Sequence, residues 1–297
     1  MAASVKQRLL NLAKKKGEDF NFLLSRFAVE RFLFRLSQSK HGKDFVLKGA
    51  MLFHLRSMEM PNRPTRDLDL MGTGTPDIAR MEKLFQGVCR ERVPDDGLAF
   101  LADSVKGEGI KDDDECMGIR LRLEARMGAA RIPLQIDVGF GDAVTPPPTK
   151  EQLQTLLDFP RPSILVYPWE TMIAEKFQAI IELGMDNSRM KDYFDIHYLS
   201  KTQSFDGPVL ARAIHAAFAR RKTPLPEDSP VGLLPAFGED TVRRTQWRAF
   251  ARRLHVEDTL SLNEIVARLR AFLLPPVEAI FRNQEFRKPW SPGGPWR

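Results

Sequence analysis

The chain has 297 residues, of which 43% are hydrophobic and 28% are charged, as in ordinary globular proteins with one large domain or two smaller ones. No stretch approaches the ~20 apolar residues that span a bilayer, and the Lys-rich segment 1–20 lacks the apolar core of a secretory signal. We therefore expect a cytoplasmic protein with no membrane contact. Cys89 and Cys116 have no paired spacing and the five histidines are scattered, which argues against a structural zinc site.

Positive charge is concentrated in the last third of the chain. Residues 211–297 contain 15 Lys and Arg against 9 Asp and Glu, whereas residues 1–210 contain 30 of each sign. The net charge of +6 therefore comes entirely from the C-terminal region. Such a region suggests an acidic partner such as nucleic acid, although a solvated helical face explains it nearly as well.

The hydrophobic pattern of the first half changes between the helical and the strand period. Helices are expected at 5–16, 19–38, 50–58 and 76–92, and strands at 45–48, 67–70, 118–127 and 132–140. The last two strands alternate strictly and are separated by a short polar segment with a glycine, which predicts a β-hairpin.

The second half is expected to be mostly helical. The Pro-rich segment 144–149 marks a connection, and a strand at 164–166 then leads through Pro168 into the first helix. Helices are expected at 168–183, 187–200 and 207–221 and, after a break at 222–235, over most of the remainder. The layout predicts an α+β domain at 1–149, a mostly helical domain at 150–287 and a flexible tail at 288–297.

Two carboxylates stand close together in the segment Arg63-Pro-Thr-Arg-Asp67-Leu-Asp69-Leu70. In a strand, Asp67 and Asp69 point to one face while Leu68 and Leu70 point to the other. Two carboxylates at this spacing repel each other unless a cation joins them, and Mg²⁺ is the usual cation for such oxygen ligands. The simpler alternative is a solvated acidic strand end.

Asp137 is the third candidate carboxylate, on the polar face of strand 132–140. If this strand lies near the first one, Asp137 faces the same cleft as Asp67 and Asp69. Three such acids can hold two divalent metals, one that clamps a triphosphate and one that activates an attacking hydroxyl. Taken alone, Asp137 is more simply a solvated acid on a hairpin.

The turn Lys48-Gly49-Ala50 leads from a strand into a helix. Gly49 permits close backbone approach, and free N–H groups at the helix start can bind a phosphate. A plain strand–helix turn needs a glycine just as often, so both interpretations remain open.

Lys176 falls within the apolar arc of the helix at 168–183. A lysine there must snorkel, pair with an acid or reach into a cleft, where it can bind a nucleotide phosphate. Asp192 and Asp195 share a face of the following helix and can anchor and orient Lys176. Snorkelling and phosphate binding remain open alternatives.

Five motifs in this order resemble the AbiEii/AbiGii family of nucleotidyltransferase toxins, a branch of the polymerase-β-like nucleotidyltransferase superfamily. They are Lys48-Gly49, Arg63-x-Thr65-x-Asp67-Leu-Asp69-Leu70, Asp137-Val-Gly-Phe-Gly-Asp142, Ala174-Glu-Lys176 and Arg189-x-Lys-Asp192-x-x-Asp195. The resemblance implies an α+β fold, with a mixed sheet, flanking helices and a mostly helical C-terminal region. It also implies transfer of a nucleotide from an NTP with Mg²⁺ or Mn²⁺ and release of pyrophosphate. In relatives the acceptor is often tRNA, so that translation is blocked, and the gene is paired with an antitoxin.

The resemblance also implies roles for individual residues. Asp67, Asp69 and Asp137 would bind metal, with Asp137 as third acid or base, and Lys176 and Asp192 match the family's two other functional positions. Lys48, Gly49, Thr65, Arg66 and Lys176 would lie against the nucleotide. Ala50 departs from the Gly-Ser or Gly-Gly of relatives, so a side-chain contact to the nucleotide phosphate is missing.

Three functions compete at this point. The first is an NTP-dependent transferase acting on tRNA, for which Arg244, Arg248 and Arg252 at i, i+4 and i+8 provide a surface that can follow a phosphate backbone. Solvated arginines beside core aromatic residues are the simpler account of that helix. The second function transfers the nucleotide to a protein hydroxyl, and the third is a catalytically idle module that binds a nucleotide or a partner.

Overall fold

The computed structural model describes residues 1–56, 67–112, 115–141, 144–254, 256 and 260–297. The chain divides into two compact units. The first comprises Met1–Asp142 with Thr149–Tyr167, and the second comprises Ala143–Pro148 with Pro168–Arg297. Each unit is described below by itself.

The first unit is built on a seven-stranded mixed sheet with the order β3-β4-β5-β2-β1-β7-β6. Its strands are β1 (Phe45–Lys48), β2 (Asp67–Gly72), β3 (Ala99–Asp112), β4 (Glu115–Met127), β5 (Ala130–Phe140), β6 (Thr149–Gln152) and β7 (Ser163–Val166). β2 runs parallel to β5 and β1 parallel to β7, whereas the other neighbours are antiparallel. The sheet continues past residue 149, where the first domain was expected to end, because the apolar segment of β7 pairs with β1.

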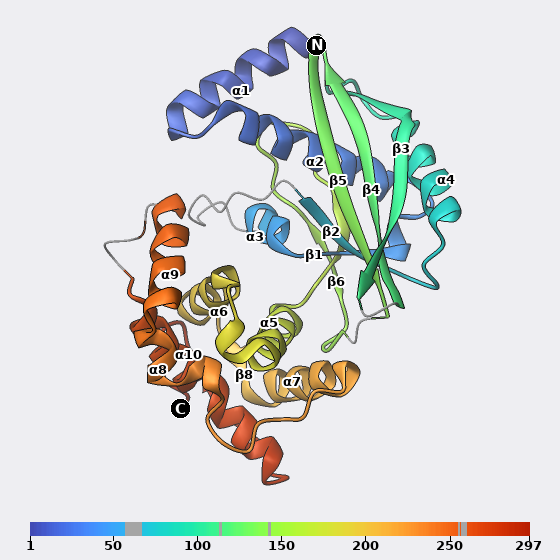
Figure 1. The fold of residues 1–297 in the computed structure, drawn as a ribbon. Helices are drawn as coiled ribbons and strands as arrows, with labels where there is room; N and C mark the ends of the chain where they lie inside the picture. Colours follow the sequence, from blue (N-terminus) through green and yellow to red (C-terminus); the bar gives the residue numbers. More distant parts are fainter. Residues whose placement is uncertain (57–66, 113–114, 142–143, 255, 257–259) are drawn as a thin grey trace. The chain divides into compact units, whose positions relative to one another are not determined.

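Helices accompany this sheet as the apolar periodicity predicts. They are α1 (Ala2–Lys16), α2 (Phe20–Gln38), α3 (Ala50–Arg56) and α4 (Ile78–Cys89), with a 3-10 turn at Gly42–Asp44. Asp19 caps α2 by accepting a hydrogen bond from the Phe22 N–H at 2.8 Å. On α4, Phe85 meets Phe45 of β1 edge-on and stacks on Phe32 of α2, so α2 and α4 cover the same sheet face (Figure 1).

The sheet is therefore apolar on one face and polar on the other. Every second residue of β5 is buried, in the alternation that the sequence predicts, and the predicted hairpin of β4 and β5 is confirmed. The long strand β3 was not predicted, because glycines and charges interrupt its pattern and its register with β4 shifts between Leu101 and Lys106.

A buried ionic network joins α2 to the loops around it. Asp96 accepts hydrogen bonds from Arg31 at 3.0 Å and from Arg35 at 2.7 Å and 3.0 Å. Glu30, the residue before Arg31 on α2, accepts a hydrogen bond from the Leu156 N–H at 2.9 Å. Burial raises the pKa of Glu30 to about 7, although the nearby arginines act against this shift. The ionisable side chains of this network are all buried: Glu30, Arg31, Arg35 and Asp96. Because water does not reach them, they stabilise one another's charges.

The second unit is mostly helical, as predicted. Its helices are α5 (Trp169–Leu183), α6 (Met190–Thr202), α7 (Gly207–Arg221), α8 (Pro235–Glu239), α9 (Thr241–Leu254) and α10 (Leu262–Phe281), with 3-10 turns at Gly184–Asp186 and Val231–Leu233. Across the described ranges, none of the helices combines the length and apolarity that a membrane span requires. The α+β class with a helical C-terminal region is thus confirmed.

The C-terminal residues differ from the expected flexible tail. Strand β9 (Pro289–Trp290) pairs with β8 (Phe205–Asp206), and Trp290 is 2% exposed. Its indole N–H donates to the carbonyl of Ser200 at 2.7 Å, and Trp296 stacks on Phe272 of α10. Composition rich in Pro and Gly suggested disorder, but the two tryptophans provide enough apolar surface to hold the segment.

Candidate functional site

The acidic residues of the first unit lie on the polar face of the sheet. β2 and β5 pair in parallel, with Asp69 opposite Asp137 and Asp67 opposite Gln135. Because register partners on neighbouring strands share a face and lie about 5 Å apart, the three carboxylates are brought together on two adjacent strands. Leu68 and Leu70 are fully buried on the opposite face. The expectation that Asp137 comes from a strand near Asp67 and Asp69 is confirmed.

Gly49 shapes the space around Asp69. Its φ is +73°, and a Cβ on this residue would lie 2.6 Å from the Cγ and 2.7 Å from the Cβ of Asp69. The Asp69 carboxyl therefore fills the place that any side chain at position 49 would need. Lys48, the register partner of Asp69 on β1, extends its ammonium group over the ring of Tyr167 at 5.5 Å. The turn of Lys48 and Gly49 thus borders the acidic face directly.

Asp137 is held by an arginine that the sequence did not single out. Arg120 of β4 is its register partner, and the guanidinium donates from Nε to Oδ1 at 2.8 Å and from Nη2 to Oδ2 at 2.7 Å. These hydrogen bonds raise the pKa of Arg120 above its ordinary value, against the opposing effect of burial. Strict alternation places Arg120 on the polar face, but its pairing with Asp137 depends on the hairpin register, which periodicity does not give.

Two predicted nucleotide contacts, Thr65 and Arg66, lie outside the described residues, as does Arg63 of the same motif. The structure therefore describes this motif only from Asp67 onward. Ala50 is the first residue of α3 and follows Gly49 directly.

The donor set partly fits a divalent cation. Among the described residues, no three His, Cys, Asp or Glu side chains are grouped closely enough to hold a metal as they stand. Asp67 and Asp69 offer two hard oxygen ligands on one sheet face, which is what Mg²⁺ commonly takes from a protein beside substrate phosphates. Each oxygen of Asp137 accepts one hydrogen bond from Arg120, which leaves a lone pair on each oxygen for a cation but partly neutralises the charge of the carboxylate.

The second unit contains a separate ionic cluster around Lys176. The ammonium of Lys176 on α5 lies 2.6 Å from Asp192 Oδ1 and 2.8 Å from Asp195 Oδ2, both on α6. The second Asp192 oxygen lies 2.9 Å from Nε of Arg189. Both carboxylates are fully buried, while the Lys176 side chain is 15% exposed. Of the alternatives predicted for Lys176, the structure therefore contains the pairing with acids.

The charges of this cluster are balanced against burial. Burial raises the pKa of the Asp192 carboxyl, but the positive charges of Lys176 and Arg189 outweigh it and hold the pKa below its ordinary value. Asp192 is therefore ionised at neutral pH and fixes the position of Lys176. Tyr193, the next residue, points the other way and donates to the carbonyl of Gly232 at 2.9 Å.

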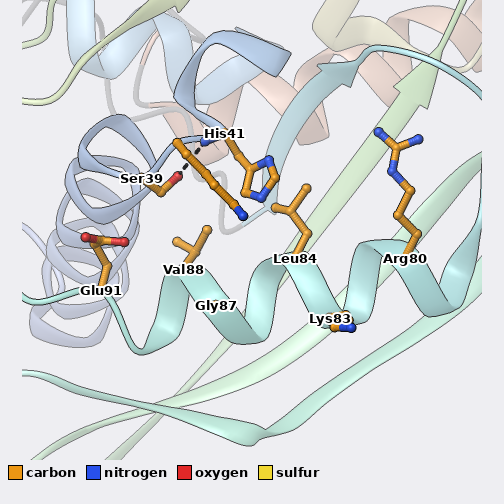
Figure 2. Close-up of a pocket in the computed structure, with 9 residues that line it drawn as sticks. Ser39, His41, Arg80, Lys83, Leu84, Gly87, Val88 and Glu91 are labelled. Atoms are coloured by element: carbon orange, nitrogen blue, oxygen red, sulfur yellow. Dashed lines mark hydrogen bonds between the residues drawn. The ribbon is translucent and has the colours of Figure 1, made fainter.

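A hollow of about 630 Å³ lies between α4 and the segment after α2 (Figure 2). Figure 2 shows Leu84 and Val88 pointing from α4 toward Ser39 and His41. The lining residues are Ser39, Lys40, His41, Arg80, Lys83, Leu84, Gly87, Val88 and Glu91. None of these is a predicted site residue, and α4 covers the apolar face of the sheet, so this hollow is distinct from the acidic face.

Comparison with known proteins finds one matching family and several solved structures, two of which are described here. No curated protein matches the chain. The crystal structure of JHP933 from Helicobacter pylori is 16% identical, with a TM-score of 0.47, over 88% of this chain and 94% of that chain. A second H. pylori protein, provisionally called a nucleotidyltransferase, is 15% identical, with a TM-score of 0.47, over 89% and 98%. The family described as "Nucleotidyl transferase AbiEii toxin, Type IV TA system" matches residues 31–283, a range that extends over both units.

Proposed function

Because the chain belongs to the AbiEii family of nucleotidyltransferase toxins, we propose that it transfers a nucleotide from an NTP to tRNA with the help of Mg²⁺ and thereby blocks translation. The observation that supports this most directly is the register of β2 and β5, which brings Asp67, Asp69 and Asp137 onto one polar sheet face. Three acids at neighbouring positions destabilise a sheet, since like charges at this spacing repel. Exposure to solvent alone therefore does not explain why the three acids are placed together.

Asp67 and Asp69 are the proposed metal ligands. When bound, Mg²⁺ would neutralise the triphosphate and favour the ionised form of an attacking hydroxyl. In the transfer, a hydroxyl oxygen of the acceptor bonds to the α-phosphorus, the bond to the bridging oxygen breaks, and pyrophosphate leaves. Asp137 is proposed as the group that accepts the hydroxyl proton or completes the metal site, and its ion pair with Arg120 opposes both roles.

The remaining proposed contacts serve the nucleotide. Lys48 and Gly49 border Asp69, and Thr65 and Arg66 are proposed to lie against the triphosphate. Lys176 is held in a fixed orientation by Asp192, its side chain is 15% exposed, and we propose that its ammonium binds a phosphate oxygen of the nucleotide. Asp192 is accordingly a positioning residue for Lys176.

The excess of positive charge in residues 211–297 supports an RNA acceptor over a protein one. Both substrates, NTP and tRNA, are cytoplasmic, and so is the proposed site of action. We expect an antitoxin as the natural partner of the toxin, in keeping with the type IV system of the family.

The test is direct labelling. The purified chain is incubated with Mg²⁺, each α-³²P-labelled NTP in turn, and total bacterial tRNA or cell lysate, and the products are separated on denaturing gels. We expect label on tRNA with one NTP and none with Asp69→Asn, which keeps the size of the side chain and removes its charge. Label on protein alone would favour a protein hydroxyl as acceptor. Folded protein that labels nothing would favour the idle binding module.

A further inference from the structure

Helix α9 of the second unit has a buried apolar side and an exposed side whose charged residues are all arginines. Its sequence contains five arginines and no Asp or Glu. Trp247, Ala251 and Leu254 are buried, and the Trp247 indole donates to the carbonyl of Leu260 at 2.9 Å. Trp247 therefore belongs to the core, as the simpler account of the sequence predicts, whereas Phe250 is half-buried. That account assigns no function to the exposed arginines.

Three of these arginines form a line on the exposed side, here called the arginine row: Arg244, Arg248 and Arg252. They are four residues apart, which corresponds to about 6 Å along the helix axis. Among the described residues none of the three side chains forms an ion pair. Like charges at i, i+4 destabilise a helix by a few tenths of a kcal/mol per pair. The row therefore weakens α9 in the free protein, and an anionic partner would reverse this effect.

The arginine row starts beside the Lys176 cluster. Arg243, at the beginning of α9, donates to the carbonyl of Asn187 at 3.3 Å, and Phe250 meets the ring of Phe194 edge-on at 5.7 Å. Each contact joins residues 56 positions apart, so α9 and α6 run side by side in the same direction (Figure 1). The first turn of α6 contains Asp192, the partner of Lys176. The row thus leads away from the end of α6 where the cluster lies.

We propose that the arginine row binds the sugar–phosphate backbone of the acceptor RNA and directs its reactive end toward the Lys176 cluster. This inference rests on the proposed function, which supplies RNA as acceptor. Arginine is well suited to the task, because its guanidinium pairs with phosphate in two parallel hydrogen bonds and is always charged.

An acidic protein partner is less suited to this surface. Protein interfaces bind chiefly through buried aromatic and other large anchors at their centre. Between the arginines the exposed side of α9 offers Thr245 and Ala249, which are too small to act as anchors but leave room for a backbone to approach. The larger exposed apolar residue of this helix, Val242, lies in the first turn, before the arginine row. Charge without apolar anchors is typical of phosphate contacts, which position a nucleic acid without reading its sequence.

The experiment measures binding of fluorescently labelled bacterial tRNA by anisotropy, without NTP, over a range of salt concentrations. The test variant combines Arg244→Gln, Arg248→Gln and Arg252→Gln. The matched control combines Arg221→Gln, Arg282→Gln and Lys288→Gln, which removes three exposed positive charges elsewhere on the same unit. Circular dichroism confirms that both variants are folded. Loss of three phosphate contacts should weaken binding roughly 100-fold at 0.1 M salt and reduce the slope of log K against log[salt] by about 2 to 3.

Three results would overturn the inference. They are unchanged tRNA binding by the test variant, equal weakening in test and control variants, and loss of binding to poly-glutamate with tRNA binding intact. The last result would assign the row to an acidic protein. The proposed function fails separately, if wild-type protein that binds tRNA transfers no nucleotide to it. If the test variant binds tRNA as tightly as the wild type and still transfers nucleotide to it, the proposed function stands. Only the role of the arginine row in RNA binding is then excluded.

Discussion

Arg120 holds both carboxylate oxygens of Asp137 on the face that contains Asp67 and Asp69. The pair is the register match of two antiparallel strands, so the backbone itself places the guanidinium against the acid. Arg120 thus partly neutralises the carboxylate that we propose as the third group of the metal site. We therefore expect Arg120 to lower the metal affinity of the site without being a ligand itself.

Arg120→Ala should bind Mn²⁺ more tightly than the wild type. The Arg120 and Asp137 side chains are 33% and 20% exposed, so the ion pair is worth only about 1 kcal/mol and its removal should lower the Kd about fivefold. The Kd for Mn²⁺ without nucleotide is measured by calorimetry. Arg122→Ala is the matched control, because Arg122 is on the same strand but pairs with Glu108 at 2.8 Å. An equal Kd in Arg120→Ala and the wild type, or a gain that persists with Asp137→Asn added, would contradict this role.

Gly49→Ala should remove Asp69 from its working position. The new Cβ would overlap the Asp69 carboxyl, and the left-handed φ costs a further 1–2 kcal/mol. We expect nucleotide transfer and Mn²⁺ affinity to fall as far as in Asp69→Asn. Gly17→Ala is the control, since Gly17 has a φ of +67° but nothing within 4 Å of a Cβ. It should lose a similar amount of stability and keep its activity. If Gly49→Ala transfers nucleotide at the rate of Gly17→Ala, the close approach to Asp69 does not matter.

Lys176→Met should destabilise the second unit as well as impair the enzyme. Asp192 and Asp195 are fully buried, and without Lys176 two negative charges remain with less compensation, at a cost of roughly 3–5 kcal/mol. Urea unfolding gives the free energy. Adding Asp195→Asn to Lys176→Met should recover part of this loss, because it removes one of the uncompensated charges. Strictly additive losses in the double variant would show that Lys176 and Asp195 do not interact energetically.

The sequence predicted most of this architecture because its strongest signals are local. Alternation in β4 and β5 and helical periodicity in α2 and α5 depend only on near neighbours along the chain, and the structure confirms these elements. The polar face of Asp67, Asp69 and Asp137 followed from the same alternation. Arg120 escaped notice because its importance depends on register, and β3 because a register shift and several glycines disturb its pattern.

Long-range contacts explain the other differences. Asp96 has no signal in the sequence, yet it is the buried acid that pairs with both Arg31 and Arg35, which lie more than sixty residues before it. The C-terminal segment suggested disorder by composition, whereas Trp290 is held by Ser200, ninety residues earlier. Such pairings depend on the packed core and are visible only after folding.

Glu30 should make the stability of the first unit depend on pH. Burial raises its pKa to about 7 in the folded protein, whereas an exposed Glu titrates near 4.5. A raised pKa means that the folded state binds the proton more tightly, so the stabilisation is complete below pH 4.5 and is lost as the pH rises through 7. Between these values the free energy of unfolding should fall by roughly 3 kcal/mol from this residue.

Glu30→Gln isolates the effect, since Gln keeps an oxygen that can accept the Leu156 N–H and does not titrate. Urea unfolding of wild type and variant at pH 5 and pH 8 should show a gain in relative stability for Glu30→Gln at the higher pH. The comparison cancels the titration of all other acids that the two proteins share. If the difference in unfolding free energy between wild type and variant is the same at both pH values, Glu30 does not titrate in this range.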